Sequence, residues 1–236
     1  MINSILHLFD DIVCKLNLLF SNNVEKKFNK LINKNLNIIV KVKLSKINFF
    51  LPNKYIYSKK YLVWHGNWIN KKKKLNIYGR FNKNYESVFQ IFKKKINYKK
   101  STEYKIKLNQ IKNKGITSRG HKNIQELDMY FNNLSQVFKD MKKSGYKNQN
   151  RLPNKRIGDE IGVFLGPKGE IVKAEDKFRG THRFAMSKIL NLKYVYINVR
   201  AVDFKFLEKF IFNRMSINDD QTVFIKKIKF FLKKYQ

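Results

Sequence analysis

The 236-residue chain has a single cysteine, Cys14, which excludes an internal disulfide and any zinc site built from several cysteines. Acidic residues are scarce too, since 17 Asp and Glu stand against 51 Lys and Arg, for a formal net charge of +34. Alanine, proline and arginine are also rare, with three, three and eight copies. Residues with A/T-rich codons, such as Lys, Asn, Ile and Phe, are abundant instead, which indicates an AT-rich genome.

The positive charge therefore has two explanations, codon bias and selection for binding a polyanion. Proteins that recognise nucleic acids favour arginine, whose planar guanidinium binds phosphates and bases bidentately, whereas this chain uses mostly lysine. Whatever its origin, such a field attracts polyanions at low salt. A DNA- or RNA-binding protein with a lysine-rich surface is thus one alternative function.

The N-terminal stretch, residues 1–20, is apolar at helical spacing but carries Asp10, Asp11 and Lys15. These charges argue against a signal peptide or a membrane span, and we expect a core-facing helix there. A helix lying on a membrane surface is the alternative for this stretch. We expect a cytoplasmic protein without a transmembrane segment, and its 43% hydrophobic residues suffice for a core.

The first half of the chain mixes strand and helix patterns. Residues 37–44 and 47–51 predict strands, and residues 85–114 contain helical material that glycines interrupt near 113–120. Trp64 and Trp68 lie among lysines and tyrosines; stacking on bases is one explanation, and packing in a core is the simpler one.

A regular helix is predicted next. The apolar residues from Ile124 to Met141 are spaced by three and four, and Gly145 stands where a C-terminal cap belongs.

The segment from 158 to 201 differs in composition from its surroundings. It holds five of the ten glycines and all three alanines. Over 151–201, eleven basic and five acidic residues leave a net charge of only 11 − 5 = +6. If codon bias depletes Gly and Ala elsewhere, their retention here indicates specific backbone and packing needs.

This segment predicts the order strand, strand, helix, strand. The first two strands, within 157–165 and 170–176, flank a Gly-Pro-Lys-Gly turn. The helix is expected over 181–190, and the last strand over 193–201, where apolar and polar residues alternate. A Gly-Thr-His-Arg turn, residues 180–183, therefore lies at the start of the helix.

That turn has the chemistry of an anion site. The first N–H groups of a helix have no partner within it and carry partial positive charge. Gly180 permits close approach of the backbone, and Thr181 supplies a hydroxyl or a cap. His182 and Arg183 add N–H donors. An ordinary capped helix with two surface basic residues would give the same pattern, so that alternative stays open.

The sequence GTHRFAMSKILNL in this strand–strand–helix–strand order resembles the ParB/sulfiredoxin superfamily, over about residues 123–202. In that superfamily a Gly-X-X-Arg turn holds nucleotide phosphates: CTP in ParB, ATP in sulfiredoxin, and ATP or ADP in free-serine kinases. The resemblance implies that Gly180, Thr181, His182 and Arg183 bind the phosphates. The His-Arg ending is more similar to the sulfiredoxin and kinase branches than to ParB.

The resemblance implies an ATP- or ADP-dependent phosphotransferase that uses Mg²⁺ and acts on a small molecule or glycan. Sulfiredoxin activity is not expected, because Thr181 stands where sulfiredoxin has its reactive cysteine. Phosphoryl transfer needs a metal ligand and usually a base for the acceptor hydroxyl. By type and proximity, Asp159, Glu160 and Asp176 are the candidates, and solvent-exposed carboxylates are the simpler interpretation of each.

These patterns predict an α/β or α+β fold. Residues 1–120 form a region of unassigned function, and residues 121–236 a ParB/sulfiredoxin-like domain with a basic amphipathic helix at 223–234. The leading hypothesis is a nucleotide-phosphate-binding protein, and its most concrete form is a kinase. The alternatives are a ParB-like nucleic-acid-binding protein and a membrane-surface or assembly protein, and the oligomeric state is open.

Overall fold

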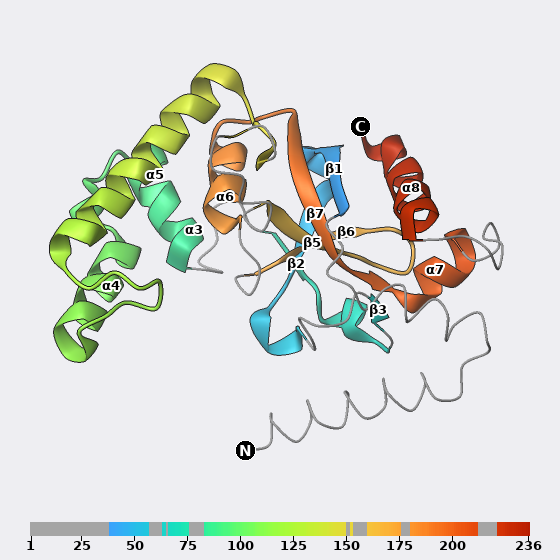
Figure 1. Cartoon of the computed structure of the whole chain (residues 1–236), viewed down its shortest axis with the longest axis horizontal. Coiled ribbons are helices and arrows are strands. Elements are labelled where there is room, and N and C mark those ends of the chain that lie inside the picture. The colour runs from blue at the N-terminus through green and yellow to red at the C-terminus, as the bar shows by residue number, and fades with distance from the viewer. Residues whose placement is uncertain are drawn as a thin grey trace, which may run out of the picture.

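The computed structural model forms one mixed β-sheet flanked by helices (Figure 1), which confirms the expected α/β class. The helix expected near residues 2–20 lies outside the described residues. The structure describes residues 38–56, 63–64, 66–75, 83–149, 152, 160–175, 180–211 and 221–236.

The described chain contributes seven strands to the sheet: β1 (Ile38–Lys43), β2 (Ile47–Leu51), β3 (Val63–Trp64), β4 (Lys73–Lys74), β5 (Ile161–Leu165), β6 (Ile171–Ala174) and β7 (Tyr194–Asp203). The order is β1-β7-β5-β6-β2-β4, and β3 pairs with the end of β7. β5 lies parallel to β7 and antiparallel to β6, β1 is antiparallel to β7, and β2 is parallel to β6.

The strands expected at 37–44 and 47–51 are confirmed as β1 and β2. Both belong to the same sheet as the C-terminal strands, because β1 pairs with β7 and β2 with β6. A domain boundary at residue 120 would cut this sheet in two. The chain is better described as one sheet with a helical insertion, residues 83–144, between β4 and β5.

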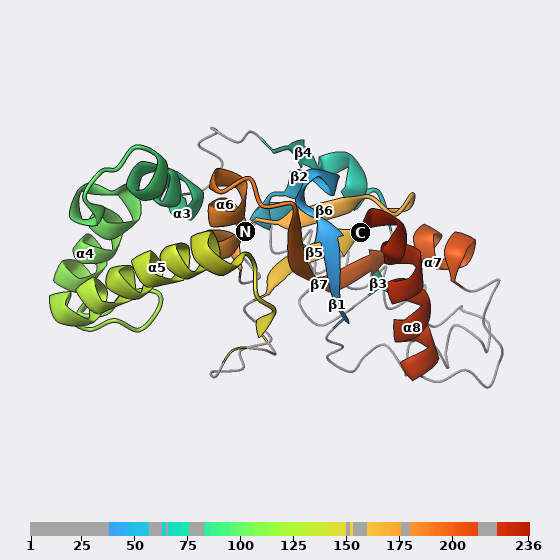
Figure 2. The same cartoon turned by 90° about the horizontal axis from the view of Figure 1, so that it is seen from above.

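The helices fall into two groups on either side of the sheet strands (Figures 1 and 2). The insertion helices α3–α5 contact α6, which lies between them and the sheet, whereas α7 and α8 lie at the other end. The bounds are α3 Lys83–Val88, which continues into a π-helical turn at Phe89–Lys93, α4 Thr102–Lys114, α5 Ile124–Ser144, α6 Thr181–Ile189, α7 Phe204–Phe210 and α8 Gln221–Leu232.

Helix α5 forms as its spacing predicts. It buries one face, and it ends at Gly145, whose φ of 71° only glycine adopts easily. At its start, the Asn123 side chain accepts a hydrogen bond from the Glu126 amide at 2.8 Å. Ile124, expected on the buried face of α5, is 51% exposed, because that face begins about one turn later, at Leu127. The buried residues of α5 are Leu127, Phe131, Leu134, Phe138 and Met141.

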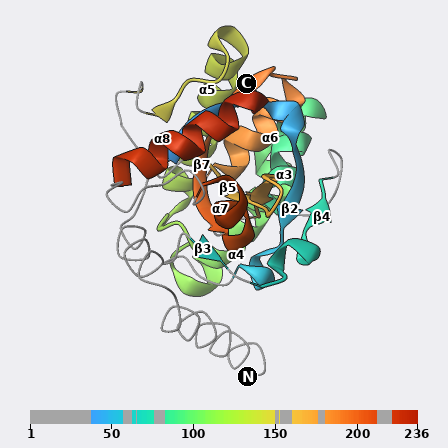
Figure 3. The same cartoon turned by 90° about the vertical axis from the view of Figure 1, so that its right-hand side faces the viewer.

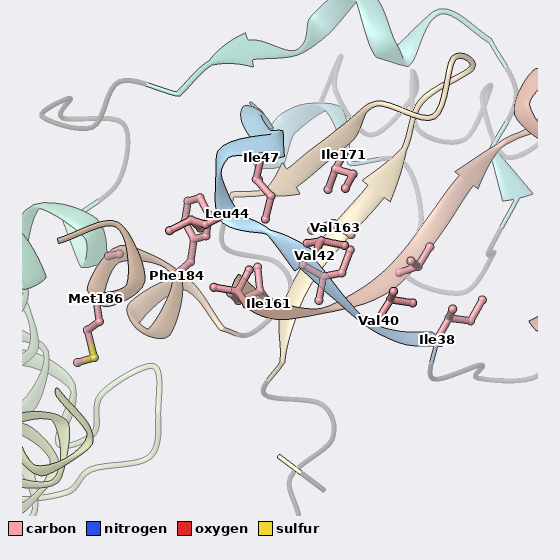
Figure 4. Close-up of a cluster of buried hydrophobic side chains, with 14 of the residues drawn as sticks. Ile38, Val40, Val42, Leu44, Ile47, Ile161, Val163, Ile171, Phe184 and Met186 are labelled. Carbon is pink, nitrogen blue, oxygen red and sulfur yellow. The ribbon is translucent and has the colours of Figure 1, made fainter. Parts of the chain in front are cut away.

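The core lies on both faces of the central strands. The apolar side of the alternation in β7 is confirmed, since Val195, Ile197 and Val199 are fully buried, but Asn198 on the polar side is fully buried as well. Figure 4 shows Phe184 of α6 beside the strands and Met186 on the opposite side of the helix, so α6 is buried on two sides.

The second face of the sheet carries the two tryptophans. Trp64 packs against Phe164 with ring centroids 4.5 Å apart and ring planes tilted by 35°, and Trp68 packs edge-on against Trp64 at 5.5 Å. Both tryptophans are buried, which confirms core packing as the explanation for them.

The basic amphipathic helix expected at 223–234 is confirmed as α8, followed by a 3₁₀ turn at Lys233–Tyr235. Phe224, Ile228 and Leu232 are buried on its inner face, and α8 lies next to β1 (Figure 3). Within the described ranges, none of the helices combines the length and the apolar character needed to cross a membrane.

Candidate functional site

The Gly-Thr-His-Arg turn joins the β5–β6 hairpin to α6. Gly180 has φ 89° and ψ 4°, a left-handed conformation, and α6 begins at Thr181. A Cβ added at position 180 would lie 2.7 Å from the Glu160 carbonyl oxygen and from the Ile161 backbone nitrogen. Position 180 therefore requires glycine, because the start of α6 is pressed directly against the start of β5.

A buried lysine lies beside Thr181. The Thr181 hydroxyl donates to the Glu175 carbonyl oxygen at 3.0 Å rather than capping α6. Lys173, 1% exposed on β6, places its ammonium 3.4 Å from that same carbonyl and also donates to the Ala174 carbonyl. The start of α6 thus has a buried lysine next to it.

Arg183 points towards the loop after α5. Its Nη1 lies 3.2 Å from Glu160 Oε2, and its Nη2 donates to the Lys147 carbonyl. The guanidinium also stacks over the Tyr146 ring, 4.0 Å from the centroid. Arg183 is therefore a half-buried, well-oriented cation rather than a freely exposed surface charge.

Glu160 is the common partner of this second cluster. It is fully buried and accepts hydrogen bonds from the Tyr146 hydroxyl at 2.9 Å, from the Gln149 amide and from Arg183. Burial raises the pKa of Tyr146 well above its usual range, although the nearby Arg183 charge opposes the shift. These contacts favour a structural role for Glu160 over the catalytic or metal-binding role that the sequence suggested.

His182 faces the helical insertion. Its Nε2 lies 2.7 Å from Oε2 of Glu103, on α4, and both side chains are buried. The Tyr130 hydroxyl, from α5, is 3.4 Å from both Glu103 Oε1 and His182 Nε2. The Lys107 ammonium lies 3.8 Å from Glu103 Oε1. The turn therefore touches both the hairpin and the insertion.

The charges around Glu103 keep it ionised. Burial alone would raise the pKa of Glu103, but the charge and hydrogen bond of His182, with the charges of Lys107 and Arg119, bring it below its usual value. Burial, and then the Glu103 charge, raise the pKa of Tyr130. Tyr130 therefore stays a neutral hydrogen-bond donor.

The structure brings Glu160 together with the four residues of the turn. Asp159 and Asp176, the other two predicted carboxylates, lie outside the described residues, and their roles stay predictions. Three residues that contact the turn, and a fourth that shares the Glu175 carbonyl with Thr181, were not predicted from the sequence. Glu103 did carry a signal, because it is one of only three acidic residues between 21 and 120. The missed residues are Glu103, Tyr130, Tyr146 and Lys173.

The donor set fits a phosphate better than a metal ion. Arg183 uses two of its five N–H donors with protein partners in the described chain, and the first amides of α6 have no partners within the helix. Among the residues that the structure describes, no group of three or more His, Cys, Asp or Glu side chains is arranged to hold a metal ion.

No protein-family model matches this chain, and neither the curated proteins nor the solved structures contain a match. The resemblance to the ParB/sulfiredoxin superfamily therefore stays a prediction.

Proposed function

We propose that residues 180–183 bind the phosphates of a nucleotide, and that the protein transfers phosphate from ATP or ADP to a small molecule or glycan. The observation that supports this proposal most strongly is the left-handed Gly180, pressed against β5 at the start of α6. Arg183 lies in the first turn of α6, and the Lys173 ammonium shares the Glu175 carbonyl with the Thr181 hydroxyl. Positive groups concentrated at a helix N-terminus are a common phosphate-binding arrangement.

Each side chain of the turn already has a protein partner, so the phosphate must use donors that remain. Arg183 keeps N–H groups beyond the two that bond to Glu160 and Lys147. In this arrangement Glu160 is a positioning residue, because it holds the guanidinium in place. The phosphate accepts from the helix amides and from the other edge of Arg183.

Isothermal titration of the whole chain with Mg-ATP, Mg-ADP and Mg-CTP, at about 0.15 M salt where surface charges are screened, tests the proposal. We expect saturable binding to one site. Arg183→Lys, which keeps the charge but loses the planar fork, should weaken binding about tenfold. Lys139→Ala, which removes an exposed charge from α5, is the matched control and should leave the affinity unchanged. Absence of binding at millimolar nucleotide overturns the proposal.

Nucleic-acid binding is a second candidate, and the excess of 51 basic over 17 acidic residues favours it. That function needs no intact turn. The two candidates therefore separate in how binding responds to salt and to substitution of Arg183.

A further inference from the structure

The contact between Glu103 and His182 is not needed to bind phosphate. It joins residues 79 positions apart, one on the helical insertion and one on the turn. The two oxygens of Glu103 are divided between partners: Oε2 accepts from His182, while Oε1 faces Tyr130 and Lys107. The Glu103 amide donates to the Ser87 hydroxyl at 2.6 Å, which fixes the first turn of α4.

The contact with the Glu103 carboxylate sets the tautomer of the His182 imidazole. An ionised carboxylate only accepts hydrogen bonds, so His182 Nε2, at 2.7 Å from it, must carry the hydrogen. In the neutral form of the ring, Nδ1 then keeps a lone pair. None of the described residues hydrogen-bonds to Nδ1, and this atom is bonded to Cγ, on the side of the ring nearest the backbone of the turn.

We propose that Glu103 and His182 form a proton-accepting pair for this site, with His182 Nδ1 as the base and Glu103 as the residue that positions it. This inference rests on the proposed phosphate-binding function. It assigns the base to a residue of the turn itself instead of to Asp159, Glu160 or Asp176. A carboxylate that fixes an imidazole tautomer is an established way to build a general base.

His182 Nδ1 takes the proton of an acceptor hydroxyl while that oxygen forms a bond to the terminal phosphorus of the nucleotide. The bond from this phosphorus to its bridging oxygen breaks, and the leaving nucleotide keeps the electron pair. The imidazolium, stabilised by Glu103, then releases its proton to solvent.

The pair also selects a class of acceptor. A base is useful for an alcohol, whose proton must leave, and is of no use for a carboxylate or phosphate acceptor that is already ionised at neutral pH. We therefore infer an uncharged hydroxyl acceptor, as in a sugar or a polyol. The charged and titratable groups facing the pair are Lys107, Arg119, His121 and Tyr130.

A purely structural contact would give the same distance, so the test needs readouts beyond stability. In nitrogen-15 NMR of histidine-labelled protein, the neutral His182 ring should be almost wholly the Nε2–H tautomer. In Glu103→Gln it should become a mixture, because an amide can both donate and accept. Asp128→Asn is the matched control: it makes the same change on the same insertion, where Asp128 accepts from Tyr104 at 2.8 Å. A wild-type Nδ1–H tautomer overturns the proposal.

The second arm measures turnover of Mg-ATP with glycerol, a simple polyol, as acceptor. Glu103→Gln should lower kcat about 100-fold or more, while the Kd for Mg-ATP and the turnover of Asp128→Asn stay at wild-type values. If the wild-type chain binds Mg-ATP but transfers phosphate to neither glycerol nor water, or if Glu103→Gln keeps full kcat, the base assignment is overturned. If the wild-type chain does not bind Mg-ATP at all, the proposed function itself has failed, and titration shows this independently of turnover.

Discussion

Glu160 and Arg183 form an ion pair, with Nη1 3.2 Å from Oε2, that joins the start of β5 to the first turn of α6. The carboxylate is fully buried and the guanidinium is 11% exposed. The phosphate site that we propose and the packing of α6 on the sheet therefore depend on the same contact.

Neutralising the carboxylate should destabilise the fold. In Glu160→Gln the side chain keeps its shape but leaves Arg183 without its counter-charge. Because the pair is buried, we expect a loss of about 2–3 kcal/mol in the free energy of unfolding. Urea denaturation followed by circular dichroism measures it.

The double variant Glu160→Gln/Arg183→Gln is the control for that loss. It removes both charges, so it should be less destabilised than the sum of the two single variants. Simple additivity would mean that the two side chains do not interact, contrary to the observed geometry.

Two glycines with left-handed backbones should respond differently to alanine. Gly180→Ala places a Cβ 2.7 Å from backbone atoms of Glu160 and Ile161, whereas Gly115, with φ 67° at the end of α4, has nothing within 4 Å. Gly115→Ala should cost about 1 kcal/mol from backbone strain alone. Gly180→Ala should cost about 3 kcal/mol or more, because the clash adds to the strain. Equal losses in urea denaturation would show that α6 is not pressed against β5.

Asp203, the last residue of β7, should make stability depend on pH. It is 3% exposed and accepts the Lys205 amide hydrogen at 2.9 Å. Burial raises the pKa of Asp203 to about 6, although the Lys205 hydrogen bond opposes the shift. The folded state therefore binds this proton more tightly than the unfolded state. The resulting stabilisation is complete below about pH 4, and it is lost as the pH rises to about 6.

Asp203→Asn keeps a cap for α7 and has no charge to bury. It should be more stable than the wild type by about 1–3 kcal/mol at pH 7.5, with the difference disappearing near pH 4. Urea denaturation at several pH values gives the difference curve. A difference that is constant with pH would contradict the raised pKa.

Binding to nucleic acid should be separable from binding to nucleotide. The affinity for a short single-stranded oligonucleotide should fall steeply with salt and should change little in Arg183→Lys, because the substitution keeps the charge among 51 basic residues. Fluorescence anisotropy over a range of salt concentrations measures this. If nucleic-acid affinity persists at physiological salt while nucleotides do not bind, the second candidate function replaces the first.

Local pattern predicted much of the fold. The strand at 47–51 and the helix that ends at Gly145 were predicted because period and turn residues are local properties. The pairing of β1 with β7 and of β2 with β6 was not predicted, since each joins segments more than a hundred positions apart. For that reason the predicted boundary at residue 120 did not anticipate that strands from both parts of the chain form one sheet.

The same distinction between local pattern and long-range contact applies to the candidate site. The turn could be located from its own residues, because a glycine followed by polar and basic residues at a helix start has recognisable chemistry. The partners Glu103 and Tyr146 could not, because only folding brings the insertion and the loop after α5 to α6. The pairing of Arg183 with Glu160 and of His182 with Glu103 was not predicted from the sequence either, and it changes the role given to Glu160.

The central claim is that the first amides of α6 hold a nucleotide phosphate. Its most direct test is a titration of nitrogen-15-labelled protein with Mg-ADP at about 0.15 M salt, followed through the backbone amides of Thr181, His182 and Arg183. We predict large, saturable downfield proton shifts at these three amides, as expected for new hydrogen bonds to an anion. Shifts confined to the exposed lysine-rich face of α8, or no shifts at millimolar Mg-ADP, would contradict the account.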